Sequence, residues 1–246
     1  MRKSIASVAV AAALAVPALA AAQAPAAASP IAGNFSLVSD YRFRGLSQTF
    51  EEPAIQGGFD YAHSSGFYVG NWNSSISDTF YAGSPLEMDF YAGYKPTFGN
   101  ITLDLGILYY WYPGSDAAGI GKIDNTELYA GAAWKWLSVK YFHAISDFFG
   151  VPDTKNSNYI DLTANFTFGA GWGLVGHIGH QKVKNLSDAD YTDYRIGITK
   201  DVGGWLLGAA FIDTDAEEAS YSPVNANGRS KFIGDSTVVL SVSKTF

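Results

Sequence analysis

The sequence predicts an all-β fold, a transmembrane antiparallel β-barrel of about twelve strands with short periplasmic turns and longer extracellular loops. Three observations predict it. Segments of about ten residues alternate between apolar and polar side chains, short and long connections alternate between those segments, and the chain ends in an amphipathic strand with a terminal phenylalanine. Strands of this length are long enough to cross a bilayer when they are tilted.

The N-terminus is expected to be an export signal that is removed from the mature protein. Arg2 and Lys3 precede an apolar run, and small residues mark a cleavage site after Ala20 or Ala24. Residues 1–24 are therefore assigned to a signal peptide, 25–33 to a flexible Ala/Pro-rich leader, and 34–246 to a single barrel domain. An exported barrel is expected in the cell outer membrane.

The chain contains few charged residues. Charged residues make up 16% of the chain, against roughly 25% in soluble domains. Cysteine is absent, which excludes thiolate metal sites and cysteine nucleophiles. The formal net charge of −7 gives no reason to expect a nucleic-acid partner. After the N-terminus, no window is apolar for long enough to form a spanning helix.

The first expected strand is NFSLVSDYRFRG, residues 34–45. One parity carries apolar residues that we expect to face lipid, namely Phe35, Leu37, Tyr41 and Phe43. The other parity carries Asp40, Arg42 and Arg44, which we expect to point into the barrel, where charge is solvated or paired.

The same alternation recurs in EMDFYAGYKPTF, ITLDLGILYYW, YIDLTANFTF and TDYRIGITK. In FYVGNWNSSI and VKYFHAISDFF the parity is unclear, so the strand count of twelve holds to within two. Parity places charges of both signs on the inner face. The candidates for lining or constricting the lumen are Asp40, Arg42, Arg44, Asp60, Glu87, Asp89, Lys95, Asp104, Glu127, Lys135, Asp161, Asp193 and Arg195.

Connection lengths and the C-terminus distinguish a membrane barrel from a soluble sandwich, which would also alternate. Short joints such as HSSG and DVGG alternate with longer polar ones such as PGSDAAGIGKI, as periplasmic turns and outer loops do. Aromatic residues gather near strand ends, as in interfacial girdles. The final strand presents Val238, Leu240, Val242 and Phe246 on one face, interrupted by Lys244. We expect this strand to be the insertion signal for the barrel-assembly machinery, with periplasmic chaperones as further partners during biogenesis.

Several segments carry a family resemblance. SDYRFRGLSQT (residues 39–49), PAIQGGFDY, GFYVGNWNSS, EMDFYAGY and the terminal SVSKTF resemble the TorF family of porin-like proteins, predicted for the outer membrane of proteobacteria. The resemblance covers about residues 34–246. It implies a porin-like barrel of a Gram-negative cell envelope and no established substrate.

We therefore predict a channel that lets small charged or zwitterionic solutes diffuse passively through a narrow, charge-lined lumen. Outer-membrane lipid, lipopolysaccharide and small solutes are the expected partners. Acidic loop residues predict a weak preference for cations. One alternative stays open: the interior charges form salt bridges that close the lumen, and the protein is a structural or adhesion barrel.

An outer-membrane hydrolase is a further alternative that the histidines do not support. His177 and His180 are three residues apart, so a strand places them on opposite faces, and the same holds for His143 and Ser146. No glycine-rich phosphate loop stands between a strand and a helix. We expect no enzyme activity, no catalytic or metal-binding residues and no cofactor.

Overall fold

The computed structural model describes residues 30–78, 81, 83–116, 121–224 and 228–246. The expected signal peptide and residues 25–29 of the expected leader lie outside the described residues. Within the described part of the chain, no helix is long and apolar enough to cross a membrane. The regular structure there is β-sheet with two short 3₁₀ helices, η1 (Phe148–Gly150) and η2 (Ser187–Ala189).

Twelve antiparallel strands form a closed barrel, which confirms the fold class expected from the sequence. They are β1 (Ile31–Val38), β4 (Ala54–Ala62), β5 (Phe67–Ser75), β6 (Leu86–Tyr94), β8 (Ile101–Trp111), β9 (Asn125–Trp134), β10 (Leu137–Ala144), β11 (Asn158–Phe168), β12 (Trp172–Lys182), β13 (Tyr191–Val202), β14 (Trp205–Thr214) and β15 (Thr237–Thr245). Each strand pairs with the next along the chain, and β1 pairs with β15 to close the ring. The short β7 (Thr97–Phe98) pairs only with β8.

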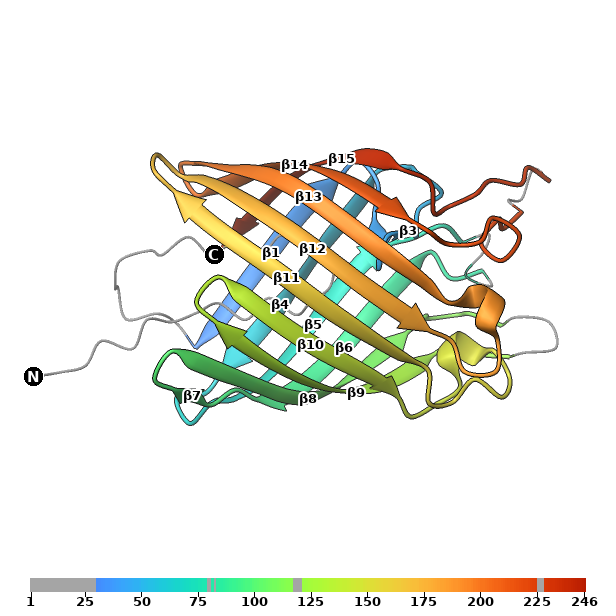
Figure 1. Cartoon of the computed structure of the whole chain (residues 1–246), viewed down its shortest axis with the longest axis horizontal. Coiled ribbons are helices and arrows are strands. Elements are labelled where there is room, and N and C mark those ends of the chain that lie inside the picture. The colour runs from blue at the N-terminus through green and yellow to red at the C-terminus, as the bar shows by residue number, and fades with distance from the viewer. Residues whose placement is uncertain (1–29, 79–80, 82, 117–120, 225–227) are drawn as a thin grey trace, which may run out of the picture.

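Short and long connections alternate around the barrel and lie at opposite ends of it. The turns of 63–66, 135–136, 169–171 and 203–204 are short, whereas residues 39–53, 76–85, 112–124, 145–157, 183–190 and 215–236 form the long connections. Figure 1 shows the short turns and the C-terminus at the left end, and both 3₁₀ helices at the right end. We call these the short-turn end and the loop end.

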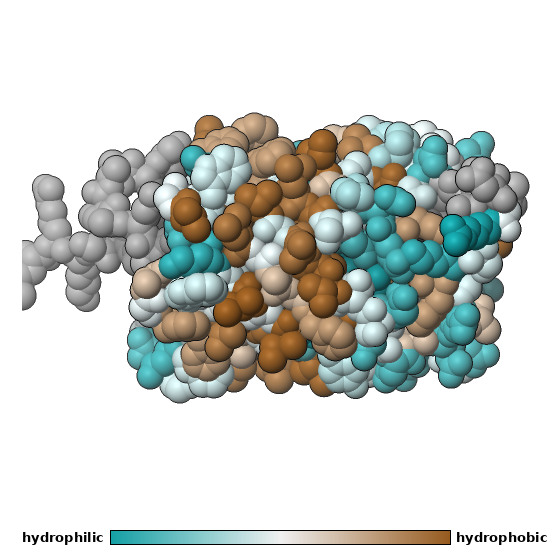
Figure 2. Space-filling model, turned by 90° about the horizontal axis from the view of Figure 1, so that it is seen from above, coloured by the Kyte–Doolittle hydropathy of each residue, from teal (hydrophilic) through white to brown (hydrophobic). Residues whose placement is uncertain are grey.

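The barrel wall is apolar outside and carries charged, polar and aromatic side chains inside. Phe59, Phe90 and Ile196 point outward with 65%, 42% and 65% of their surface exposed, whereas Glu87 and Asp89 point inward and are buried. On the face drawn in Figure 2, apolar side chains gather over the middle of the wall and hydrophilic surface gathers toward the loop end. Exposed apolar side chains occur on all twelve wall strands, from Ile31 on β1 to Leu240 on β15, and we call them the apolar belt. Such a belt is typical of barrels whose outer wall faces lipid.

The seam between β1 and β15 includes the C-terminal residue. The Gly33 N–H donates to the Phe246 carbonyl (2.7 Å), and the Phe246 N–H donates to the Gly33 carbonyl (2.9 Å). Because Gly33 has no side chain, the Phe246 ring can lie against it. β1 therefore begins inside the expected leader, since residues 31–33 pair with β4. The outward face of β15 presents Val238 and Leu240, exposed by 59% and 57%, with Val242 half-buried, and Phe246 just after the strand is 70% exposed.

Candidate functional site

The expected first strand is wrong beyond Val38, because the chain leaves the wall there and folds into the lumen. β2 (Arg42–Phe43) and β3 (Leu46–Ser47) form a two-stranded hairpin. Arg44 and Gly45 between them have φ angles of 48° and 84°, and two successive positive φ angles are what a type I′ turn needs. Tyr41 and Phe43 consequently pack among interior aromatic rings and do not face lipid; Tyr41 is only 2% exposed. We call residues 40–49 the inner hairpin.

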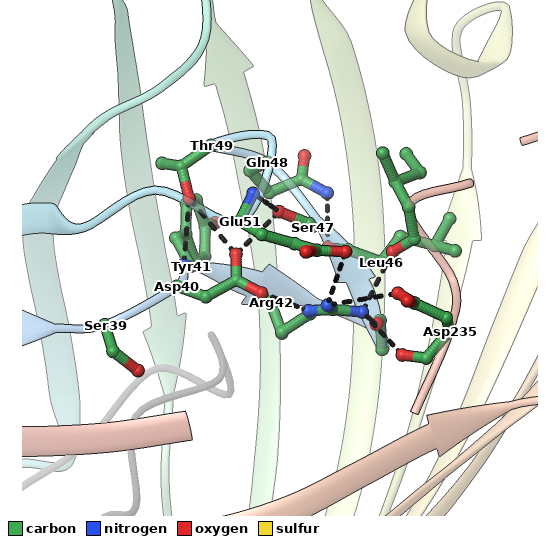
Figure 3. Close-up of polar contacts among 12 residues, drawn as sticks. Ser39, Asp40, Tyr41, Arg42, Leu46, Ser47, Gln48, Thr49, Glu51 and Asp235 are labelled. Carbon is green, nitrogen blue, oxygen red and sulfur yellow. Dashed lines mark hydrogen bonds and ion pairs between the residues drawn. The ribbon is translucent and has the colours of Figure 1, made fainter. Parts of the chain in front are cut away.

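An ion pair between Asp40 and Arg42 holds the base of the inner hairpin. The Arg42 Nε donates to the Asp40 Oδ2 at 2.5 Å, and the hydroxyls of Ser47 and Thr49 donate to the Asp40 Oδ1 at 2.6 and 3.1 Å. The side chains of Arg42 and Asp40 are 1% and 6% exposed. Figure 3 shows the carboxylate enclosed by these donors. The pair is therefore desolvated but fully hydrogen-bonded on the carboxylate side, which a buried ion pair requires.

The other side of the Arg42 guanidinium contacts the connection between β14 and β15. Its Nη1 donates to the carbonyl oxygens of Ile233 (2.9 Å) and Asp235 (3.0 Å). Its Nη2 lies 3.6 Å from carboxylate oxygens of Glu51 and of Asp235. Glu51 also pairs with Lys231. Arg42 thus links the inner hairpin to Asp235, which lies 193 residues further along the chain.

Arg44 ties the tip of the inner hairpin to two strands of the wall. Its Nη2 donates to Glu127 on β9 and its Nη1 to Gln181 on β12, both at 2.7 Å. The guanidinium carbon lies 4.3 Å from the centre of the Tyr159 ring and 5.2 Å from that of Phe142, so cation–π attraction adds to the ion pair. The side chains of Arg44 and Glu127 are 5% and 0% exposed. The tip is therefore anchored across the lumen.

Aromatic side chains fill the space around the inner hairpin. Tyr41 makes an edge contact with Trp72, with ring centres 5.4 Å apart, and Phe43 does so with Tyr110 (5.6 Å) and Phe149 (6.0 Å). On β12 to β15, the inward positions toward the short-turn end carry small residues, among them Gly173, Gly197, Gly208, Ala210, Ser241 and Ser243. On this part of the wall the larger inward side chains are therefore concentrated in the loop half of the barrel.

Tyrosine hydroxyls donate to carboxylates elsewhere on the inner wall. The pairs are Tyr91 with Asp60 (2.6 Å), Tyr68 with Asp104 (2.5 Å) and Tyr159 with Asp193 (2.7 Å). A glycine on a neighbouring strand makes room for each ring, since a Cβ at Gly70, Gly93 or Gly179 would collide with Tyr91, Tyr68 or Tyr159. These tyrosines were not among the residues predicted for the lumen, although the inward parity of β6 and β11 contains Tyr91 and Tyr159.

Two basic side chains were also missed. Lys140 on β10 pairs with Asp104 at 2.7 Å and lies over the Tyr129 ring. Parity could not place it, because β10 carries aromatic residues on both faces, Tyr141 outside and Phe142 inside. His177 lies between Asp161 and Asp193, with nitrogen–oxygen distances of 3.0 and 2.7 Å.

Twelve of the thirteen candidate lumen residues lie inside the barrel. Asp40, Arg42 and Arg44 do so on the inner hairpin, and Asp60, Glu87, Asp89, Asp104, Glu127, Asp161, Asp193 and Arg195 on the wall; Lys95 follows β6 and is half-buried near Asp104 and Lys140. Lys135 is misplaced in the sequence analysis. Its strand ends at Trp134, and with a φ of 55° Lys135 turns outward and lies exposed over the Trp134 ring.

The interior of the described barrel is more acidic than basic. Eight carboxylates (Asp40, Asp60, Glu87, Asp89, Asp104, Glu127, Asp161 and Asp193) accompany five lysines and arginines (Arg42, Arg44, Lys95, Lys140 and Arg195) and His177. Glu87 accepts hydrogen bonds from Tyr41 (2.8 Å) and Tyr112 (3.1 Å). Burial and the charge of Glu87 raise the pKa of Tyr41 well above its ordinary value, so this hydroxyl stays a donor.

The described residues contain no group of three or more His, Asp or Glu side chains arranged to hold a metal ion. His177 faces the interior, whereas His180 is exposed on the outer face and contacts Thr192. His143 contacts Asn156, while the Ser146 hydroxyl donates to Asn125. These histidines and Ser146 therefore do not come together as a nucleophile and its base.

Comparison with known proteins identifies a family and a shared fold. Residues 22–246 match the Gcw_chp family, described as a bacterial protein of unknown function, and the chain belongs to this family. The relation to TorF porins stays a prediction. No curated protein matches the sequence.

Several solved structures share the fold at low sequence identity. The KdgM porin aligns with a TM-score of 0.56 and 8% identity, over 87% of this chain and 99% of that one. A KdgM porin in complex with disordered oligogalacturonate aligns with a TM-score of 0.54 and 9% identity, over 88% of this chain and 98% of that one. The NanC porin aligns with the same values as that complex. At these identities the likeness shows the fold alone.

Proposed function

We propose that this member of the Gcw_chp family is a porin-like barrel of a bacterial outer membrane, whose narrow lumen passes small charged or zwitterionic solutes. The apolar belt and the closed backbone hydrogen bonding support a membrane location, because lipid leaves no partner for an open sheet edge. The observation that carries the proposal is the inner hairpin, which narrows the loop half of the lumen without forming part of the wall.

The proposal includes a route to the membrane. Residues 1–24 would direct export, and the amphipathic β15, which Phe246 directly follows, would be bound by the barrel-assembly machinery. Its exposed apolar face supports this role. Lipopolysaccharide and outer-membrane lipid would surround the folded barrel.

We expect the inner hairpin to form the narrowest part of the channel and therefore to limit its electrical conductance. In planar bilayers the wild type should give small, discrete conductance steps, and replacing both Arg42 and Arg44 by alanine should enlarge them, because both anchors of the hairpin are lost. The control replaces Lys155 and Lys184 by alanine, which removes the same charge from exposed loop positions. Unchanged steps in the double arginine variant, with the barrel folded, would move the constriction away from the hairpin.

The excess of interior carboxylates is expected to make the channel prefer cations. Asp60 is suited to test this, because its carboxylate accepts from Tyr91 at 2.6 Å and no ion pair of it is found among the described residues. Asp60→Asn keeps that acceptor, and we expect the reversal potential in a salt gradient to shift toward zero. Asp153→Asn in an exposed loop is the matched control. An anion-selective wild type would reject the expected cation preference.

A non-conducting structural or adhesion barrel is the second candidate. The aromatic packing around the inner hairpin and its buried ion pairs favour it. A folded wild type that stays silent in bilayers over a range of salt concentrations would support this function and exclude the channel.

A further inference from the structure

Three lysines lie over tryptophan rings on the outer wall at the short-turn end. The Nζ atoms of Lys135, Lys200 and Lys244 are 4.6, 5.0 and 5.0 Å from the ring centres of Trp134, Trp172 and Trp205. We call these six residues the Lys–Trp band. The three rings are 46%, 39% and 41% exposed, so they are part of the outer surface. The band includes Lys244, the residue that interrupts the apolar face of the last strand.

The band lies at the short-turn ends of its strands, since Trp134 ends β9 while Trp172 and Trp205 begin β12 and β14. Lys200 is the direct register partner of Trp172, and Lys244 continues the outward series of Val238, Leu240 and Val242. A lysine on the lipid face of a barrel is costly at the bilayer midplane and tolerated near the interface. Tryptophan is enriched at that same level. The band therefore marks the membrane interface on the short-turn side.

The charges of the band have no carboxylate partner within the described residues. Lys140 and Lys231 form ion pairs, whereas Lys135, Lys200 and Lys244 take part in none of those found. Lys200 additionally donates to the Ala170 carbonyl. An ammonium that rests on an aromatic face keeps N–H groups free for an anion. The acidic loop residues, such as Asp153 and Glu217, lie at the opposite end of the barrel.

We propose that the Lys–Trp band binds the headgroups of anionic phospholipids in the leaflet on the short-turn side. Each lysine would hold a lipid phosphate while the tryptophan beside it packs against the upper acyl chain. Three such sites on β9–β10, β12–β13 and β14–β15 would hold anionic lipid along the part of the wall that runs from β9 to β15. The inference rests on the membrane location proposed above, and it is independent of conduction.

Tryptophan quenching by brominated lipid tests this contact directly. The refolded full chain is placed in phosphatidylcholine vesicles that contain either brominated phosphatidylglycerol or the same fraction of brominated phosphatidylcholine. We expect stronger quenching by the brominated phosphatidylglycerol, with about fivefold enrichment per lysine. High salt should reduce the difference, because the attraction is electrostatic. Equal quenching by both lipids would overturn the inference.

Two triple variants, each lacking three lysines, show whether the excess quenching depends on the Lys–Trp band. Replacing Lys135, Lys200 and Lys244 by glutamine should abolish the excess quenching, while replacing Lys155, Lys182 and Lys184 at the loop end should leave it unchanged. Retention of the excess in the first variant would overturn the inference. Heat-modifiable gel mobility confirms folding of both, and the wild-type salt series decides the matter if the first variant fails to fold. No quenching by either lipid would instead contradict the membrane location itself.

Discussion

Replacing Arg44 by alanine is expected to lower the free energy of unfolding by about 3–5 kcal/mol, the usual cost of breaking a buried ion pair from one side. The substitution removes the charged partner of the Glu127 carboxylate, which is 0% exposed in the wild type, and leaves the Tyr110 hydroxyl, 3.1 Å away, as its donor. It also removes the cation from the Tyr159 and Phe142 rings. The temperature at which the barrel loses its heat-modifiable gel mobility measures the effect.

A double variant distinguishes the loss of the ion pair from a general loss of packing around Arg44. Arg44→Met combined with Glu127→Gln removes both charges and keeps the volume, so most of the lost stability should return. Lys155→Ala is the matched loss of an exposed charge and should be almost neutral. If Arg44→Ala alone were as stable as the wild type, the inner hairpin would not be held by this pair.

The fold could be predicted from sequence because the alternation of the strands has a single physical cause. A closed wall between an apolar and a polar medium forces a period of two, and residues such as Ile196 and Asp193 follow it without exception along β13. The inner hairpin could not be predicted in this way. The barrel interior around the hairpin is itself aromatic. Tyr41 and Phe43 therefore have the parity and the apolar character of lipid-facing residues, although they pack inside. The available signal was local: Gly45 after Arg44 supplies a type I′ turn.

The candidate site was predictable residue by residue but not as a set of contacts. Parity places Asp161 and Asp193 inside, yet nothing in the spacing shows that His177 joins them, because their distance depends on the register of three strands. Lys135 is a case in which parity itself gave the wrong side of the wall. It continues the inward parity of Glu127, but the strand has already ended, so periodicity no longer applies.

Gly179→Ala is expected to destabilise the barrel by about 1–3 kcal/mol, because an added Cβ has no room on the inner wall. It would collide with the Tyr159 hydroxyl, which now donates to Asp193 at 2.7 Å and would have to leave that position. Gly176→Ala, three residues earlier on the same strand, is the control: its Cβ would point outward with nothing within 4 Å, and it should be neutral or slightly stabilising. Unfolding temperatures of the two variants, measured side by side, give the difference. Equal temperatures would mean that Tyr159 is free to move, and the rigid packing of tyrosine against glycine on the inner wall would then not contribute to the stability of the barrel.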